Sequence, residues 1–280
     1  MTVARIGFAY NPTSEDALEL RERAAGWCRM HGVEQWAAPA GETADKLDEL
    51  RRTDALVVLG GDGTFLRAAQ SIAEVDVPII GINLGKVGFL SMAEANELEG
   101  LLEKLQAGSF AIRERMALTG QILQAGRTPD GTFTALNDIV VARGSLARVV
   151  RLDVSIDESH LATFVADGLV VASPTGSTGY SFSAGGPILE PHSRNLVVTP
   201  IAGYLSAIRS IVVSPRQVVR ARVTDAHEAL VSIDGREDMP LAVGDIVEVG
   251  ALDRPIRLIV PVGARPFWDL LRQKVALLPS

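Results

Sequence analysis

The segment 55–67 constrains the fold of this chain more than any other, because it reads as a strand, a glycine turn and a helix in direct succession. Residues 56–59 are apolar and end abruptly in glycine, which is typical of a buried strand. Thr64 is suited to cap the helix that follows. The apolar residues of that helix share one face: Leu66, Ala69, Ile72 and Ala73. Strand, glycine turn and helix together present free backbone N–H groups to an anion.

The turn itself is Gly-Gly-Asp-Gly at 60–63, and its glycines let the backbone approach a phosphate closely. Asp62 stands among them, and a carboxylate repels phosphate unless it holds a metal or accepts a proton. The alternative is a tight turn with no ligand. The Gly-Lys-Ser/Thr ending of a P-loop is absent, and Leu66 occupies the place of the third glycine of a dinucleotide fingerprint.

Composition excludes several classes of protein. A net charge of −7 with no Lys/Arg run argues against a nucleic-acid-binding surface. The single cysteine, Cys28, excludes an internal disulfide, and we expect it to be buried on a helix. The four histidines show no ligand spacing, so no protein metal ligands are predicted. No apolar run reaches spanning length and no signal-peptide pattern opens the chain, so we expect a cytoplasmic protein without a membrane partner.

The order of elements predicts two domains. Strands at 5–10, 36–38, 56–59 and 77–82 alternate with helices at about 14–30 and 44–50, which predicts an α/β domain with a parallel, Rossmann-like sheet. Ligands bind beyond the C-terminal ends of such strands, so the loop 81–90 is expected to form a second wall beside the glycine turn.

Beyond a helix at 98–105 the apolar period changes to two, as in a β-sandwich. Short strands are expected at 152–156, 163–166, 169–172, 196–199, 211–213, 218–223, 230–233, 246–249 and 256–260, with Asp234-Gly235 as a hairpin turn. The last segment, 267–277, returns to helical spacing. We therefore predict an α/β nucleotide-binding domain at 1–112 plus 265–280 and an all-β sandwich domain at 113–264, with the C-terminal helix packing on the first domain.

Two polar stretches interrupt the sandwich pattern. Residues 173–183 carry hydroxyls and glycines at almost every position, which looks too polar for a core. Such a loop can hydrogen-bond ribose or phosphate while Tyr180 stacks on a base, or it is a plain Gly/Ser connection. Asn137 and Asp138, at the head of a strand, form an amide–acid pair that suits two vicinal ribose hydroxyls; a simple turn is the alternative.

Taken together, these motifs resemble the NAD kinase family. They are Gly-Gly-Asp-Gly-Thr at 60–64, the glycine-rich loop at 81–90, Asn-Asp at 137–138, Asp-Gly-Leu at 167–169, Thr-Gly-Ser-Thr-Gly-Tyr at 175–180 and Ser-Ala-Gly-Gly-Pro at 183–187. The first motif is shared with lipid kinases and phosphofructokinases, whereas the serine- and threonine-rich motif is more specific. The resemblance implies transfer of the γ-phosphoryl group of ATP to the 2′-hydroxyl of the adenosine ribose of NAD, with Mg²⁺, in a homodimer or homotetramer.

The resemblance also implies roles for individual residues. Asp62 is the expected general base, and Phe89 the apolar wall near the adenine. Asn137 and Asp138 hold NAD, and Asp167 contacts its nicotinamide end. The remaining expected nucleotide contacts are Gly61, Gly63, Thr64, Arg67, Arg148, Thr175, Thr178, Gly179, Tyr180, Ser183 and Arg236, with Lys86 as a further nearby cation.

The sequence departs from the family pattern at several positions. Asp138 stands where glutamate is usual, and Ala202-Gly203-Tyr204 lacks a family histidine. Val165 replaces a common arginine, and Arg236 a common glutamine. A lipid kinase is the first alternative, although no apolar or basic membrane-facing surface is evident. A non-catalytic NAD(P)-binding sensor that uses the same loops is the second.

Overall fold

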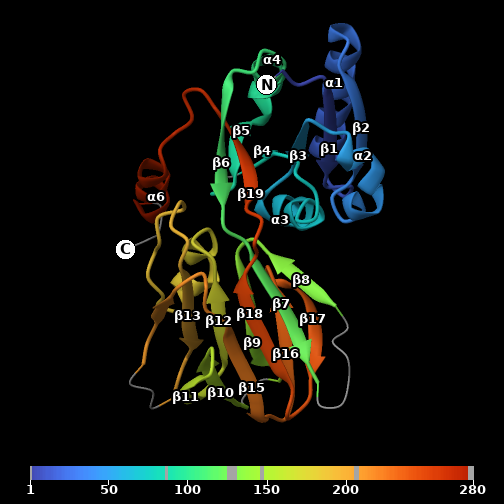
Figure 1. Cartoon of the computed structure of the whole chain (residues 1–280). Coiled ribbons are helices and arrows are strands. Elements are labelled where there is room, and N and C mark those ends of the chain that lie inside the picture. Colours follow the sequence, from blue (N-terminus) through green and yellow to red (C-terminus); the bar gives the residue numbers. More distant parts are fainter. Residues whose placement is uncertain (1, 86–87, 125–130, 146–147, 205–207, 277–280) are drawn as a thin grey trace. The chain divides into compact units, whose positions relative to one another are not determined.

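The computed structural model describes residues 2–85, 88–124, 131–145, 148–204 and 208–276. The chain divides into two compact units. Unit 1 comprises Met1–Glu114 and Ile256–Ser280, and unit 2 comprises Arg115–Pro255. Figure 1 labels the elements of both units.

Unit 1 is built around a parallel sheet. In the part of the chain that the structure describes, this sheet has seven strands in the order β2-β1-β3-β4-β19-β6, with β5 paired to β4. The strands are β1 (Arg5–Tyr10), β2 (Glu34–Pro39), β3 (Ala55–Leu59), β4 (Ile79–Asn83), β5 (Ser91–Glu94), β6 (Phe110–Arg115) and β19 (Ile256–Pro261). The helices are α1 (Glu15–His31), α2 (Leu47–Arg51), α3 (Asp62–Ser71), α4 (Leu98–Gln106) and α6 (Phe267–Ala276), with 3₁₀ turns at Thr43–Lys46 and Ala95–Glu97.

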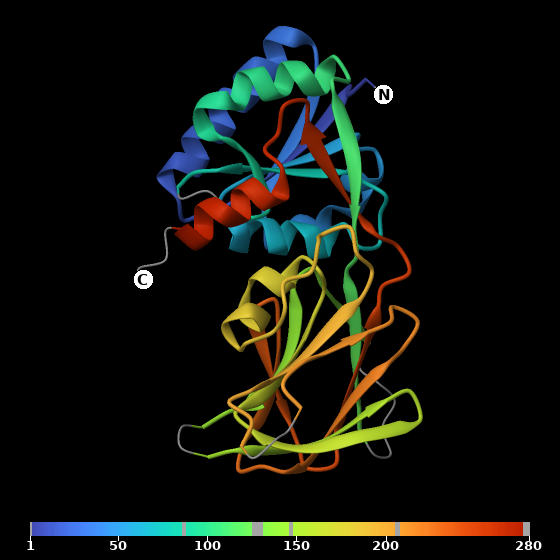
Figure 2. The ribbon, with the colours of Figure 1, turned by 90° about the vertical axis from the view of Figure 1, so that its left-hand side faces the viewer.

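Helices cover both faces of this sheet, as Figure 2 shows. On one face, alternate strand residues such as Phe8, Val57 and Ile80 form a single core with α1 and α4. On the other face, α3 contributes Phe65 and buried alanines. Every residue of β3 and β4 is buried, which explains why these strands read as continuous apolar runs rather than as alternating ones.

Unit 2 consists of two antiparallel six-stranded sheets in the described part of the chain, in the orders β11-β10-β15-β18-β7-β8 and β14-β13-β12-β9-β16-β17. The strands of the first sheet are β7 (Leu118–Leu123), β8 (Thr132–Ala135), β10 (Val150–Ile156), β11 (Ser159–Ala166), β15 (Val219–Asp225) and β18 (Ile246–Ala251). Those of the second are β9 (Asp138–Arg143), β12 (Gly168–Ala172), β13 (Leu196–Ile201), β14 (Ile211–Val213), β16 (Ala229–Ile233) and β17 (Arg236–Leu241). A 3₁₀ turn, Gly176–Thr178, and the single turn α5 (Tyr180–Ser183) follow β12.

The two sheets of unit 2 share one apolar core. Strand β10 shows the alternation clearly, because Val150, Leu152 and Val154 are buried whereas Arg151 is exposed. Phe164 and the inward residues of β9, β12, β16 and β18 complete this core. An α/β unit with a parallel sheet and an antiparallel β-sandwich are therefore the fold class that the sequence predicts.

One strand differs from its expected place. Residues 256–260 were expected in the sandwich, but β19 lies in the sheet of unit 1, where Leu258 pairs in parallel with Ile79 of β4. The chain accordingly returns to unit 1 at Ile256 rather than at residue 265. The sequence of a short apolar strand does not indicate which strand it pairs with. An apolar run such as 256–260 is compatible with the parallel sheet and with the sandwich alike.

The structure shows the caps of two helices and the burial of the cysteine. Ser14 caps α1 by accepting a hydrogen bond from the N–H of Ala17. Thr64 does not cap α3, because that helix already begins at Asp62 with Gly61 as its N-cap. Cys28 is fully buried, and burial raises the pKa of its thiol to about 11. Among the described residues, no helix is long and apolar enough to span a membrane.

Candidate active site

The carboxylate of Asp62 is fixed by the loop that follows β4. The backbone N–H of Phe89 donates to its Oδ2 at 3.1 Å, and that of Leu90 donates to its Oδ1 at 3.4 Å. The structure thus brings together the two loops that the sequence placed at neighbouring strand ends, since β3 and β4 pair in parallel. Asp62 is half-buried, so its carboxylate combines a fixed orientation with access to a ligand.

Gly88 makes this contact possible. A Cβ at residue 88 would lie 1.9 Å from Oδ1 of Asp62 and 2.5 Å from its Cγ. No side chain fits into that space, so residue 88 must be glycine if Asp62 keeps its position. The sequence included Gly88 within a motif, but it gave no signal of this contact.

The first turn of α3 is open to an anion. Gly61 is the N-cap, so no cap side chain accepts a hydrogen bond from the N–H groups of the first turn. The N–H of Thr64 donates to the carbonyl of Gly61. Thr64 packs against Gly60, where an added Cβ would lie 2.6 Å from the threonine Oγ1. Backbone N–H groups at the start of a ten-residue helix carry partial positive charge, which favours a phosphate there.

The aromatic ring of Phe89 contacts the C-terminal helix of the same unit. Its centroid lies 6.3 Å from that of Phe267 on α6, with the planes tilted by 42°. Phe89 is half-buried and so keeps an accessible apolar face.

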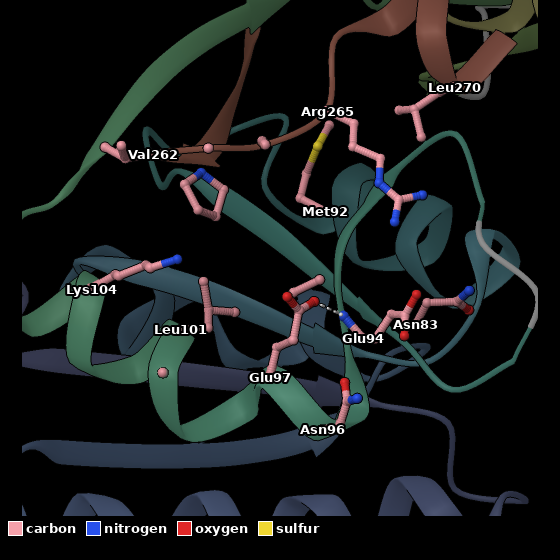
Figure 3. A pocket seen from close by; sticks show the side chains of 15 residues that line it. Asn83, Met92, Glu94, Asn96, Glu97, Leu101, Lys104, Val262, Arg265 and Leu270 are labelled. Atoms are coloured by element: carbon pink, nitrogen blue, oxygen red, sulfur yellow. Dashed lines mark hydrogen bonds between the residues drawn. The ribbon is translucent and has the colours of Figure 1, made fainter. Parts of the chain in front are cut away.

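A separate cavity of about 520 Å³ opens elsewhere in unit 1. Figure 3 shows it between β5, α4 and the connection from β19 to α6, with Lys104, Arg265 and the Glu94–Glu97 capping pair on its walls. Asn83 borders it, but no residue of the glycine turn does. Its walls carry positive and negative side chains beside apolar ones. The described lining residues do not provide a group of hydrogen-bond donors directed at one phosphate.

In unit 2, Asp234 organises the turn that carries the predicted amide–acid pair. Its carboxylate accepts hydrogen bonds from three successive backbone N–H groups, those of Leu136 at 3.0 Å, Asn137 at 2.7 Å and Asp138 at 3.2 Å. The Asp234-Gly235 turn has φ values of 51° and 71°, as a type I′ hairpin turn requires. The hairpin was predicted, whereas this function of the Asp234 side chain was not.

Asp138 and Asp234 form a buried pair of acids, each less than a tenth exposed. Burial, with the charge of Asp234 as a second cause, raises the pKa of Asp138 to about 7. Burial also raises the pKa of Asp234, but three backbone N–H groups and Arg236 oppose the rise. The three backbone N–H groups and Arg236 favour the ionised form of Asp234, whereas burial and the charge of Asp234 favour the protonated form of Asp138.

Asp167 is paired with an arginine that the sequence did not single out. Arg143, at the end of β9, approaches Asp167 with Nε at 2.8 Å from Oδ1 and Nη2 at 3.2 Å from Oδ2. Val165 occupies the position of a common family arginine, and here Arg143 provides the guanidinium for Asp167. The register of β9 with β12 brings the two together, and that register is not readable from sequence.

The serine-rich stretch 173–183 is less open than its composition suggests. Ser173, Ser177 and Ser181 are fully buried. The hydroxyl of Ser173 donates to the carbonyl of Leu136, and that of Ser177 accepts from the N–H of Leu189 at 2.9 Å. The expectation that this stretch is too polar for a core is wrong for these three serines, because backbone groups satisfy the hydroxyls of Ser173 and Ser177 and that of Ser181 lies 3.2 Å from Oγ1 of Thr199.

The other predicted residues of this stretch differ from those serines. Tyr180 is 46% exposed, Ser183 is exposed, and Thr178 and Gly179 are half-buried. Thr175 is buried, and its Oγ1 has no hydrogen-bond partner among the described residues. A buried hydroxyl without a partner costs about 1–3 kcal/mol, so a ligand that supplies one gains affinity.

The predicted basic residues are distributed differently. Arg67 on α3 and Arg148 before β10 are exposed, and neither contacts a predicted site residue through a hydrogen bond or ion pair that the structure shows. Arg236 is half-buried and lies close enough to Asp234 to influence its pKa. Lys86 lies outside the described residues.

A glycine turn that opens a helix beside a fixed carboxylate in an α/β unit, in a chain whose β-sandwich carries a buried pair of acids, is typical of a nucleotide-binding phosphotransferase. The family models narrow this class. The ATP-NAD kinase N-terminal domain matches residues 7–110, and the ATP-NAD kinase C-terminal domain matches residues 136–260. The chain belongs to the NAD kinase family.

Individual relatives agree with this assignment. The NAD kinase of Heliobacterium modesticaldum is 38% identical over 279 residues, which cover 96% of this chain and 98% of the relative. That of Syntrophotalea carbinolica is 37% identical over 97% of this chain and 98% of the relative. An NAD kinase from Archaeoglobus fulgidus in complex with ATP has a TM-score of 0.79 at 26% identity, covering 98% of this chain and 100% of that one.

A yeast NADH kinase complexed with NADH has a TM-score of 0.86 over 99% of this chain and 88% of that one, at 24% identity, and shows likeness of fold. These comparisons favour neither a lipid kinase nor a non-catalytic sensor.

Proposed function

We propose that this chain is an ATP-dependent NAD kinase, which transfers the γ-phosphoryl group of ATP to the 2′-hydroxyl of the adenosine ribose of NAD and forms NADP. Family membership supports the reaction. The observation that carries the assignment of roles is the Asp62 carboxylate, held by two backbone N–H groups beside the open first turn of α3.

Asp62 is the proposed general base. Phosphoryl transfer passes through a loose transition state, so catalysis depends on positioning and on neutralising charge. The amides of Gly61 and Gly63, with Thr64, are placed to hold donor phosphates at the start of α3. Asp62, at the same helix end, is placed to accept the 2′-hydroxyl proton as the oxygen attacks the γ-phosphorus.

A divalent cation fits this arrangement as a partner of the substrate phosphates. Among the described residues, no group of three His, Cys, Asp or Glu side chains could hold a metal ion. Mg²⁺ commonly binds through one or two carboxylates and the phosphates of a nucleotide, and Asp62 is the carboxylate available at the glycine turn. When bound, Mg²⁺ neutralises charge on the transferring phosphoryl group.

Unit 2 holds NAD in this proposal. Asn137 and Asp138 bind ribose hydroxyls, Asp167 binds the nicotinamide end, and Tyr180, with Thr175, Thr178, Gly179 and Ser183, surrounds the adenosine. In the pairing of β9 with β12, Asp138 lies opposite Ala172, and Asp167 directly precedes the pair at the other end, Gly168 with Ala142. The two acids are therefore about 17 Å apart along the strands at the rise of a β-strand. Such a separation suits an extended dinucleotide. Phe89, Arg67, Arg148 and Arg236 are further proposed contacts.

A cytoplasmic location and a homodimeric or homotetrameric assembly belong to the same proposal, on the basis of the resemblance. Size-exclusion chromatography with light scattering tests the assembly.

The decisive experiment incubates the purified protein with Mg-ATP and NAD and measures NADP with an NADP-specific dehydrogenase. We expect wild type to form NADP and Asp62→Asn to lose about 10²–10⁴-fold in kcat, the range of a general base, while it still binds NAD. Asp48→Asn is the matched control, because that side chain is 98% exposed in the same unit. Unchanged turnover in Asp62→Asn contradicts the role, and NADP formed only with polyphosphate contradicts the donor.

A further inference from the structure

We propose that Asp234 is a positioning residue for NAD, which acts by fixing the backbone that aims the Asn137 and Asp138 side chains. This inference rests on the proposed function of that pair. Asp234 is not among the residues proposed to contact NAD. Its carboxylate contacts the backbone of the residues that are.

The Asp234 carboxylate holds the turn before β9 by its backbone. Three consecutive N–H groups of that turn donate to it at 2.7–3.2 Å, although it belongs to a hairpin about a hundred residues distant in sequence. The N–H of Asp234 in turn donates to the carbonyl of Asp138 at 2.9 Å. The turn before β9 is thereby held at both ends, and the directions of its two side chains follow from it.

Other contacts hold the carbonyl side of the same turn: the hydroxyl of Ser173 donates to the carbonyl of Leu136, and its N–H donates to that of Asn137. Gly176 approaches the carbonyl of Asn137 so closely that an added Cβ would lie 2.1 Å from that oxygen. This packing fixes the outer side of the turn, but it provides no hydrogen bond to the three N–H groups. In the part of the chain that the structure describes, the side chain that accepts from these three N–H groups is that of Asp234, and a carboxylate accepts more strongly than a neutral group.

The charges near Asp138 support the same role. On β9, β16, β17 and the turn between β16 and β17, the charged side chains that the structure describes are those of Arg143, Asp234, Arg236 and Asp238. Asp234 raises the pKa of Asp138, and Arg236 acts on Asp234. An ionised carboxylate accepts from both hydroxyls of a ribose through two charged oxygens, whereas the protonated form gives up one of these acceptors to an O–H donor and accepts more weakly. NAD affinity should therefore increase as the pH rises through about 7, and Asp234 should set the midpoint.

The test measures NAD binding by calorimetry from pH 5.5 to 8.5, because binding does not require a phosphoryl donor. For Asp234→Asn we expect affinity at pH 8 to fall about 10- to 100-fold, as for other misplaced binding groups. We also expect the midpoint of the pH dependence to move down by about one unit, since a like charge has been removed. In turnover assays, KM for NAD should rise far more than kcat falls.

Asp245→Asn is the matched control. Asp245 is also a buried acid of unit 2, and its carboxylate accepts from the N–H of Ala242 at 2.9 Å in the turn between β17 and β18. Its loss should lower stability without changing the NAD affinity or its midpoint. Equal effects of the two substitutions on NAD binding overturn the proposal, as does an Asp234→Asn midpoint that stays at the wild-type value.

Asp138→Asn keeps the proposal falsifiable if Asp234→Asn does not fold. It leaves the three N–H contacts intact and should make NAD affinity independent of pH between 6 and 8. A wild-type affinity that does not change over this range overturns the proposal. Wild type that binds NAD with the expected midpoint but forms no NADP contradicts the proposed function alone.

Discussion

At the scale of single residues, Asp62 keeps its orientation because residue 88 has no side chain. A Cβ added there would lie 1.9 Å from Oδ1, which leaves no room for even a methyl group. Asp62 and Gly88 lie 26 positions apart in the sequence, and the parallel pairing of β3 with β4 brings the loops that carry them together.

Gly88→Ala should therefore displace the Asp62 carboxylate. We expect kcat to fall about 10²-fold, since a shift of the order of 1 Å in a reacting group has effects of this size. KM for NAD should change less than kcat, because most of the proposed NAD contacts lie in unit 2. Steady-state kinetics measure both constants. Gly100→Ala is the control, since nothing lies within 4 Å of its added Cβ, and a Gly88→Ala enzyme with wild-type kcat contradicts the argument.

The raised pKa of Asp138 also predicts how stability depends on pH. In the unfolded chain this carboxyl releases its proton near pH 4, whereas in the folded chain it does so near pH 7. Between these values the folded state binds more protons, so the free energy of unfolding falls as the pH rises. Asp138→Asn should reduce that slope. Urea unfolding at pH 5, 6, 7 and 8 measures it, and equal slopes in both proteins contradict the assignment.

At the scale of elements, the 3₁₀ turn Gly176–Thr178 packs directly on the turn before β9. The same stretch buries Ser173 and Ser177, whose hydroxyls bind backbone groups of residues 136 and 189. A stretch that reads as an open polar loop is thus a compact support for the predicted NAD contacts.

Gly176→Ala should disturb this support. The added methyl group meets backbone at 2.1 Å, so we expect a loss of about 1–3 kcal/mol in the free energy of unfolding, the usual cost of overpacking, together with weaker NAD binding. Denaturant unfolding measures the first and calorimetry the second. Gly250→Ala in β18 is the control, because its nearest neighbour, Val218, lies 4.0 Å away. If both variants unfold alike, the close contact is not a constraint.

At the scale of the whole molecule, unit 1 is discontinuous in sequence. The chain forms the first part of unit 1, continues through unit 2 and then returns to unit 1 with β19 and α6. Leu258 and Ile259 are almost fully buried within unit 1, and β19 lies between β4 and β6, pairing with the start of β4 at Ile79 while β5 pairs with its later residues.

A chain that ends after Pro255 should consequently fail to form a stable unit 1. We expect proteolysis to degrade residues 1–114 while it leaves 115–255 resistant, because every strand of the sandwich is retained. A chain that ends after Ala276 keeps β19 and α6 and serves as the control. Limited proteolysis with mass spectrometry distinguishes the two. Equal resistance of unit 1 in both chains contradicts the role of β19.

The sequence by itself determined the fold class and the family. Continuous apolar strands, helical spacing and the change to a period of two are local patterns, and the ordered motifs from the glycine turn to the serine-rich loop identify the NAD kinase family. The tertiary structure alone decided which distant groups meet. It placed β19 in unit 1, aimed Asp234 at the turn before β9, paired Arg143 with Asp167 and set Gly88 against Asp62. Strand register and long-range packing decide such contacts, and neither has a local signature in the sequence.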